Sequence, residues 1–236
     1  MARTPAQARD WAEAGIALLR AAAGPGDARL AGPSLLPGWT RAHVVAHVAA
    51  NADALGNLAH WAATGEPTPM YASPDERAEG IARGAELPPA DLVAWLGSSA
   101  AALGRAMDAL GPEQWSAPVV TAQGRTVPAT ELPWMRAREV CVHAVDLGTD
   151  IGFDALPAPF LAALCEDIAA KRSAAPGPAV RLYADDTAHA FTLTAGGEAV
   201  EVRGPLAALT AWLAGRPHPL TTTTAGAPLP DLGPWL

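Results

Sequence analysis

The sequence contains few cysteines, few charged residues and no long uncharged apolar segment, and each shortage excludes a class of protein. Cys141 and Cys165 are the only cysteines among 236 residues, too few for a disulfide framework. Charged residues make up 17% of the chain, below the roughly 25% of an average globular protein, which excludes a disordered polyelectrolyte. No segment reaches about 18 uncharged apolar residues, so we expect no membrane span. The N-terminus lacks the basic start and apolar centre of a secretory signal, and we expect a cytoplasmic protein.

Acidic residues outnumber basic ones by 24 to 16, and the formal net charge is −8. This balance argues against nucleic acid or an anionic membrane as a partner, because both attract basic surfaces. Half of the residues are apolar, and the length allows one large domain or two small ones with a substantial core. Because the apolar content does not require a dimer, we expect a monomer.

Caps, prolines and glycines divide the first 150 residues into helices. Thr4-Pro5 is typical of a helix start, and Thr40 is an N-cap residue before a run of apolar side chains. We therefore predict helices over residues 5–24, 41–63, 74–83, 90–110 and 133–148, and a small hairpin between residues 117 and 128.

The pattern changes after Gly152. A helix over residues 159–172 is followed by three predicted strands, 180–184, 190–194 and 199–203, and by a closing helix over 205–214. Gly196-Gly197 predicts a hairpin between the second and third strands. The fold class is thus α plus α/β, with a helical domain over residues 1–152 and a smaller α/β domain over 153–236.

Two pairs of potential metal ligands have the same helical spacing. His43 and His47 lie four residues apart on one predicted helix, and Glu139 and His143 lie four apart on another. Residues at this spacing share a helix face, so two such helices in a bundle can hold a divalent ion between them. Imidazole and carboxylate suit zinc, and three protein ligands leave one position open for substrate. The spacing does not decide which three of the four residues bind, and Glu139 with His143 can equally be a helix-stabilising pair.

The cysteines are poorly placed for chemistry. Cys141 lies about 200° around the helix from both Glu139 and His143, so we expect it to point away from them into the core. Cys165 has no histidine or acidic residue at ligand spacing. A thiol that takes part in a reaction here would come from outside the protein.

Several ordered segments resemble one family. Residues 36–47 read LPGWTRAHVVAH, residues 133–147 read PWMRAREVCVHAVDL, and residues 51–55, 61–65 and 69–71 lie between them. Together they resemble the mycothiol-dependent maleylpyruvate isomerase family, whose first domain is a DinB-like four-helix bundle. Residues 211–216 and 229–236 resemble that family's smaller C-terminal α/β domain. At position 141 the family often carries a bulky aromatic residue, a difference that we expect to alter packing and not chemistry.

The resemblance implies roles for individual residues. It implies that His47, Glu139 and His143 bind zinc or another divalent metal, while His43 supports the site or is structural. Arg216 corresponds to the family's functional arginine and would hold a substrate carboxylate; otherwise it forms a surface ion pair. Asn51, one turn beyond His47, would contact the thiol cofactor or orient a ligand; otherwise it is a buried polar residue satisfied by its neighbours.

The implied reaction is the cis-trans isomerisation of maleylpyruvate to fumarylpyruvate with mycothiol as cofactor. A free thiol has a pKa near 8.5, so zinc would be needed to supply the thiolate at neutral pH. The thiolate adds to the double bond, the resulting single bond rotates, and loss of the thiol gives the trans product. Two alternatives remain: a mycothiol S-transferase that conjugates the thiol to another electrophile, and a non-catalytic, metal-stabilised module that binds a small ligand.

Overall fold

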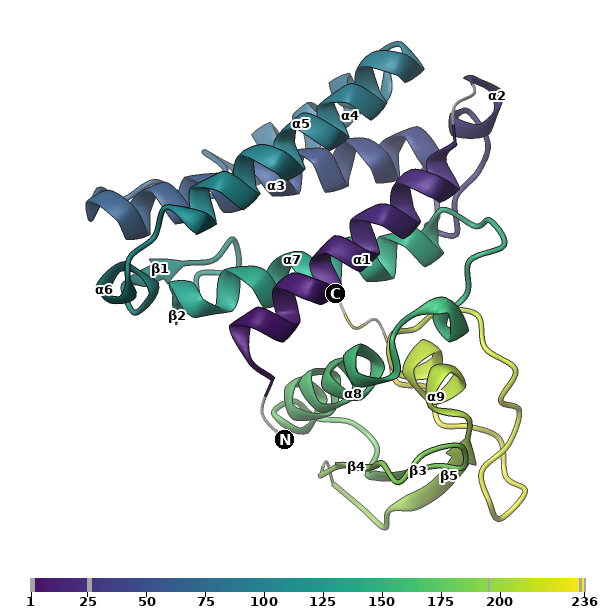
Figure 1. Ribbon diagram of the computed structural model, residues 1–236. Helices are drawn as coiled ribbons and strands as arrows, with labels where there is room; N and C mark the ends of the chain where they lie inside the picture. The colour runs from purple at the N-terminus through teal and green to yellow at the C-terminus, as the bar shows by residue number, and fades with distance from the viewer. Residues whose placement is uncertain (1–2, 25–26, 195, 234, 236) are drawn as a thin grey trace. The chain divides into compact units, whose positions relative to one another are not determined.

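The computed structural model describes residues 3–24, 27–194, 196–233 and 235, which form two compact units (Figure 1). The first unit comprises Thr4–Ile151, and the second comprises the chain from Gly152 onward together with Arg3. Met1, Ala2, Pro234 and Leu236, at the ends of the two predicted domains, lie outside the described residues.

Four long helices form the bundle of the first unit: α1 (Pro5–Ala23), α3 (Arg41–Thr64), α5 (Pro89–Asp108) and α7 (Leu132–Asp146). Helix α1 packs on α7, α3 packs on α5, and α3 also contacts α7. Figure 1 shows these helices running side by side. The connecting segments contain α2 (Asp27–Leu30), α4 (Pro74–Ala85), α6 (Pro112–Trp115), the hairpin β1 (Pro118–Val120) with β2 (Thr126–Pro128), and the 3-10 turn η1 (Ala129–Glu131). The predicted helical bundle is confirmed.

Local signals set the helix limits. The Thr4 side chain accepts a hydrogen bond from the Gln7 backbone at the start of α1, and Pro5 occupies the first helical position. Thr40 caps α3 in the same way, and Gly65 ends α3 with a left-handed φ of 76°. The core side chains of α3 include Leu55 and Leu58, both fully buried. Each such leucine contributes about 1.5–3 kcal/mol relative to an exposed one.

A glycine allows α1 to approach α7 closely. A Cβ on Gly15 would lie 2.6 Å from Cγ2 of Val140 and 2.7 Å from Sγ of Cys141. Cys141 is fully buried and its thiol donates a hydrogen bond to the backbone oxygen of Trp11. The rings of Trp11 and Trp134 meet edge to face at 6.0 Å. The prediction that Cys141 packs into the core is therefore confirmed.

The second unit is a three-stranded sheet with two helices, α8 (Ala158–Ser173) and α9 (Leu206–Leu213), on one face (Figure 1). The short turn η2 (Phe153–Ala155) precedes α8. The strands are β3 (Val180–Ala184), β4 (Ala190–Leu193) and β5 (Val200–Gly204), in the order β4-β3-β5. The small α/β fold following a helical bundle is as predicted.

The predicted hairpin between the second and third strands is wrong. Strand β5 pairs in parallel with β3, and β4 pairs antiparallel with the other edge of β3. Leu193 at the end of β4 and Val200 at the start of β5 both pair with Val180, so the intervening loop crosses the end of β3. The glycine pair signals only a local turn, whereas the pairing of the strands depends on burial. The order β4-β3-β5 makes β3 the central strand, with Val180 and Leu182 fully buried.

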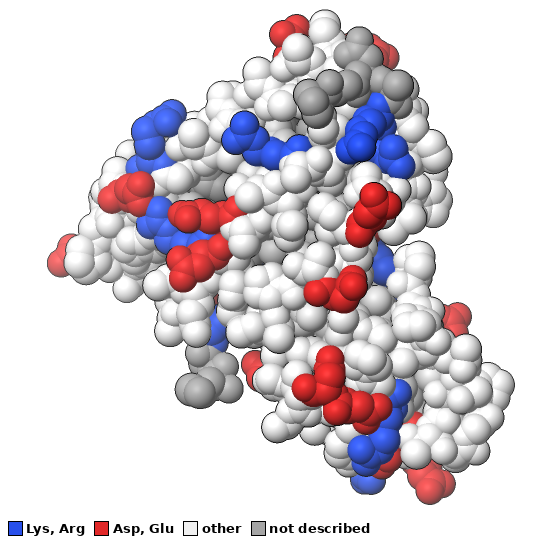
Figure 2. Space-filling model, turned by 45° about the vertical axis from the view of Figure 1, so that its right-hand side comes forward, with Lys and Arg blue, Asp and Glu red and all other residues white. Residues whose placement is uncertain are grey.

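Among the described residues, no helix combines the length and the apolar content required to cross a membrane. On the face shown in Figure 2, acidic and basic side chains are interspersed, and the basic ones form only small separate groups.

Candidate metal centre

The two predicted ligand pairs contribute unequally to one cluster between α3 and α7. Nε2 of His47 lies 2.9 Å from Oε2 of Glu139, and Nε2 of His143 lies 3.4 Å from the same oxygen. The rings of His47 and His143 are nearly perpendicular, with centroids 4.7 Å apart. One nitrogen or oxygen from each of the three side chains lies within 4.8 Å of the other two, close enough to share a metal ion.

Two arginines hold α3 against α7 on either side of this cluster. At one end, Arg41 donates from Nε to the Leu147 oxygen (2.7 Å) and from Nη2 to the Gly148 oxygen (2.8 Å). These bonds satisfy carbonyls of the two residues that follow α7, where the chain leaves the helix. At the other end, Arg136 donates from Nη1 to the Val48 oxygen at 2.7 Å. The cluster therefore sits where the two helices are cross-linked by side chains.

Asp146 orients His143 from the end of α7. Its carboxylate is fully buried, and Oδ2 lies 2.9 Å from Nδ1 of His143. The imidazole therefore carries a proton on Nδ1 and directs Nε2 toward Glu139 and His47. Carboxylate support of this kind is typical of histidines that bind metals. The spacing Glu139, His143, Asp146 places all three on one helix face, a signal from which Asp146 could have been predicted.

Burial and hydrogen bonding set different protonation states in the three side chains. Burial opposes ionisation of Glu139, but hydrogen bonds from His143 and His47 hold its pKa well below the usual range. Burial also opposes charge on His143, but hydrogen bonds to Asp146 and Glu139 raise its pKa to about 9. The pKa of His47 is lowered, chiefly by burial. At neutral pH, without metal, the cluster thus contains an ionised carboxylate, one charged imidazole and one neutral imidazole.

Comparisons with known proteins identify the family of this chain. Residues 11–148 match the model of the mycothiol maleylpyruvate isomerase N-terminal domain, and residues 155–234 match that of the MDMPI C-terminal domain. The chain belongs to the mycothiol maleylpyruvate isomerase family. Two solved structures are similar: a mycothiol-dependent maleylpyruvate isomerase and a variant of it in which one histidine is replaced by alanine. Each is 39% identical over 97% of both chains, with a TM-score of 0.89. No curated protein matches significantly.

The donor set fits the metal that the family resemblance implies. Two imidazoles and one carboxylate are ligands that zinc accepts, and the Nδ1 proton shared with Asp146 leaves Nε2 of His143 for a metal. In the described part of the chain, no fourth histidine, cysteine or carboxylate joins the group. Three protein ligands leave a coordination position open, as in catalytic zinc sites of other proteins.

His43 is placed differently from His47. It is the fourth residue of the capping box that begins α3: its Nδ1 lies 2.7 Å from the Thr40 hydroxyl and accepts from the Thr40 backbone at 3.3 Å. It does not belong to the cluster of His47, Glu139 and His143. A structural role therefore accounts for His43. Of the two histidines four residues apart, His43 belongs to the helix cap and His47 to the ligand cluster.

Asn51 and Arg216 make contacts of their own. Oδ1 of Asn51, which is 5% exposed, accepts a hydrogen bond from Nη1 of Arg136 at 3.0 Å. Arg216 follows α9 in the second unit, where its Nη1 donates to the backbone oxygen of Ala214 at 2.7 Å. Neither contact tests the role that the family resemblance implies.

Sequence reasoning missed two side chains beside His47. Nη2 of Arg77, on α4, lies 3.4 Å from Nδ1 of His47. The indole of Trp39 lies 5.7 Å from the His47 ring in an edge-to-face arrangement. No local pattern could have predicted the Arg77 contact, because it depends on how α4 packs on α3.

Proposed function

We propose that this protein catalyses the mycothiol-dependent isomerisation of maleylpyruvate to fumarylpyruvate, with zinc or another divalent metal at His47, Glu139 and His143. The observation that carries the proposal is the convergence of these three donors in a chain that is 39% identical to a mycothiol-dependent maleylpyruvate isomerase over 97% of its length. Donors that are buried (His47) or half-buried (Glu139 and His143) on two cross-linked helices keep their positions as substrate enters and product leaves.

The protein's residues bind and orient in this reaction. A zinc ion at these atoms would supply mycothiol sulfur as thiolate, the nucleophile for reversible addition to the cis double bond. His47 and His143 provide neutral nitrogens, and Glu139 provides one negative charge. Asp146 retains the Nδ1 proton of His143 and so fixes the tautomer whose Nε2 faces the metal.

The protein's own thiols take no part. Burial raises the pKa of Cys141 to about 12 and that of Cys165 to about 12, so both stay protonated at neutral pH. Cys141 packs against α1 on the opposite side of α7 from the ligands. The nucleophile is therefore an external thiol.

Two further roles follow the family resemblance. Arg216 would hold a substrate carboxylate through a bidentate pair. Asn51 would contact the thiol cofactor or orient a ligand through the groups that Arg136 leaves unused. An Arg216→Met variant should raise the KM for maleylpyruvate, and an Asn51→Ala variant should raise the KM for mycothiol; unchanged constants would remove the two residues from the site.

The deciding experiment is an assay of zinc-loaded protein with maleylpyruvate, with and without mycothiol, following loss of the cis-enedione absorbance. Turnover is expected only with mycothiol. His47→Ala should lose both metal and activity, whereas His43→Ala, the matched histidine four residues away, should keep both. Full activity in the His47 variant would exclude the proposed site, and Cys141→Ser should be active.

The product distinguishes the proposal from its alternatives. Mass spectrometry should find fumarylpyruvate at the mass of the substrate and free mycothiol that is not consumed. A stable adduct of substrate and thiol would identify an S-transferase instead. Metal binding without any turnover of thiol or electrophile would identify a non-catalytic module.

A further inference from the structure

Arg77 is a charged side chain next to the metal centre without a charged partner. Its guanidinium is half-buried, with Nη2 3.4 Å from Nδ1 of His47 and Cζ 5.8 Å from the centroid of the Tyr71 ring. Among the described residues, no carboxylate lies within ion-pair distance of it. The guanidinium is therefore able to pair with an anion from outside the protein.

The packing of α4 on α3 places Arg77 there. Gly84, near the end of α4, is buried where a Cβ would lie 2.9 Å from Cβ of Ala46 and 2.7 Å from the Trp95 ring. This close approach aligns α4 with the part of α3 that carries His47. The fold therefore places the α4 backbone that carries Arg77 beside the metal centre.

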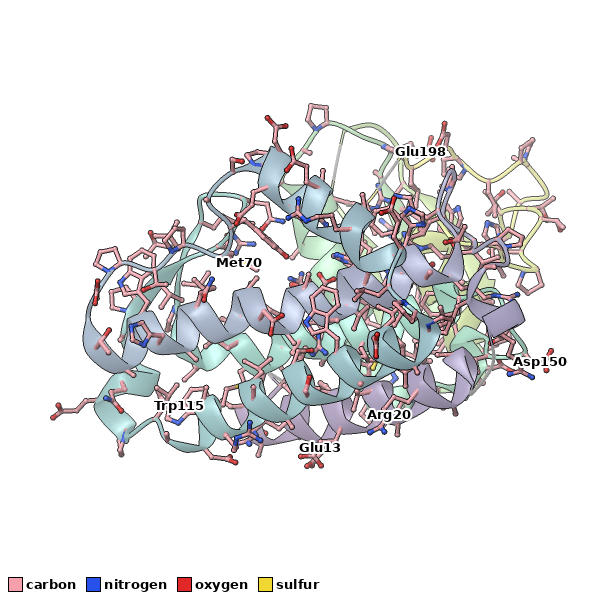
Figure 3. The ribbon with its side chains drawn as sticks, turned by 90° about the horizontal axis from the view of Figure 1, so that it is seen from above. Glu13, Arg20, Met70, Trp115, Asp150 and Glu198 are labelled. Carbon is pink, nitrogen blue, oxygen red and sulfur yellow. The ribbon has the colours of Figure 1, made fainter. Side chains whose placement is uncertain are left out.

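The same arginine lines a cavity of about 420 Å³ between α3, α4 and the loop that carries Met70 and Tyr71. Met70 is labelled in Figure 3. This volume lies within the roughly 300–1,000 Å³ typical of small-molecule sites. His47, Glu139 and His143 do not line this cavity, and Arg77 is the lining residue that also contacts His47.

The other charged side chains that line the cavity already have partners. Asp53 accepts from the Trp95 indole at 2.8 Å, Glu76 accepts from the Ala72 backbone at 2.6 Å, and Arg83 pairs with Glu79 at 3.3 Å. Arg77 alone of the four has only uncharged neighbours, the His47 imidazole and the Tyr71 side chain, whose ring and hydroxyl it contacts. A ligand anion would meet Arg77 as the one available cation among these lining residues.

Metal binding at His47 would remove the imidazole nitrogen, Nδ1, as a hydrogen-bond acceptor for Arg77. Without metal, Nε2 of His47 donates to Glu139, which leaves the Nδ1 lone pair to accept from Arg77. When Nε2 binds a metal, the proton of the neutral ring must reside on Nδ1, which then presents a donor to the guanidinium. The metal-loaded protein would therefore leave the Nη2 donor of Arg77 to a ligand.

We propose that Arg77 binds the carboxylate of maleylpyruvate adjacent to the cis double bond. This inference rests on the proposed function, in which the reacting double bond must lie at the metal centre. A guanidinium at the edge of His47 is then close to the carboxylate nearest that bond, and the planar fork matches a carboxylate with two parallel hydrogen bonds. Arg77 would fix which end of the dicarboxylate substrate faces the metal.

The test uses maleate as the probe, because it has a cis double bond with an adjacent carboxylate. Its affinity for the zinc-loaded protein is measured by calorimetry without mycothiol, beside the zinc content. Arg77→Met should weaken maleate binding roughly 10- to 100-fold, as expected for a hydrogen bond to a charged group, with one zinc per chain retained. Arg77→Lys, which keeps the charge but not the fork, should bind more tightly than the methionine variant and more weakly than the native protein.

Arg83→Met is the matched control, since Arg83 lies on the same helix and lines the same cavity but pairs with Glu79. It should bind maleate as the native protein does. Equal maleate affinity in the native and Arg77→Met proteins would overturn the proposal, and so would loss of zinc in that variant, which would make Arg77 a support for His47. In kinetics, Arg77→Met should raise the KM for maleylpyruvate and leave that for mycothiol unchanged.

The two proposals fail in different ways. If the native protein does not isomerise maleylpyruvate, the function is wrong even where maleate binds through Arg77. If the native protein turns over and Arg77→Met has the native KM for maleylpyruvate, only the role of Arg77 is wrong.

Discussion

Zinc added to the metal-free protein should release about one proton per chain at pH 7. Hydrogen bonds to Asp146 and Glu139 outweigh burial and raise the pKa of His143 to about 9, so its imidazole is charged at neutral pH. Zinc needs the Nε2 lone pair and must displace that proton. Glu139 is already ionised and His47 already neutral, because their pKa values are both lowered. His143 is therefore the source of the released proton.

The direction and size of the pH effect follow. Below pH 9 the competing proton is bound, so apparent zinc affinity should fall about tenfold for each unit of acidification. Between pH 8 and pH 6 the loss is roughly 100-fold, or about 2.7 kcal/mol. Chelator competition measures the affinity, and calorimetry in two buffers of different ionisation enthalpy measures the released proton. An affinity that does not change between pH 6 and 8 would refute the reasoning.

The variant Asp146→Asn separates the effect of the Asp146 charge from the effect of its shape. The amide has nearly the same shape but no charge, so the pKa of His143 should fall and the pH dependence should flatten. At pH 8 the zinc affinity should be about 10- to 100-fold weaker, as for other supporting carboxylates. Asp108→Asn, which changes an exposed ion pair with Arg9, is the control and should leave the zinc affinity and its slope unaltered. An Asp146→Asn variant with the native slope would show that this carboxylate does not set the pKa of His143.

Three other predictions concern helix packing, thiol reactivity and helix capping. Gly15→Ala should overpack the contact of α1 with α7, which costs about 1–3 kcal/mol of stability, offset by the roughly 1 kcal/mol that alanine gains in helix propensity. Gly97→Ala, which has open space around its Cβ, should increase the free energy of unfolding by about 1 kcal/mol, as measured by urea denaturation. Equal changes in the two variants would contradict the packing argument. Cys141 and Cys165 should not react with a thiol reagent at pH 8 until the protein is unfolded, since their raised pKa values keep them protonated; rapid reaction of the native protein would show an accessible thiolate. His43→Ala should cost about 0.5–1 kcal/mol of stability by removing half of a capping box, while zinc content stays at the native value; loss of zinc would make His43 a ligand.

Local chemistry accounts for the features that were predictable. Thr40 can cap only the backbone of the next turn, so the start of α3 is determined within four residues. The spacing of Glu139 and His143 places both on one face of α7 whatever the helix packs against. The limits of most elements and two of the three ligands on a common face thus follow from the sequence itself.

Contacts between distant segments account for what was missed. The glycine pair after β4 predicts a tight turn, yet β5 pairs on the far side of β3, because strand order depends on burial across the whole sheet. His43 and His47 have equal standing by spacing, and only the capping of Thr40 and the packing of α3 on α7 separate them.

The sequence by itself determined where the helices of the bundle begin and end, and that it carries two pairs of potential ligands one turn apart. The spacing left His43 and His47 equivalent, and the family resemblance implied His47. The tertiary structure shows that His47 meets Glu139 and His143, and it alone decided that Asp146 supports His143 and that Arg77 lies against His47. The physical reason is the sequence separation over which each effect acts. Capping and helical periodicity act within about four residues, whereas the contacts of His47, Asp146 and Arg77 depend on which helix faces are buried against each other.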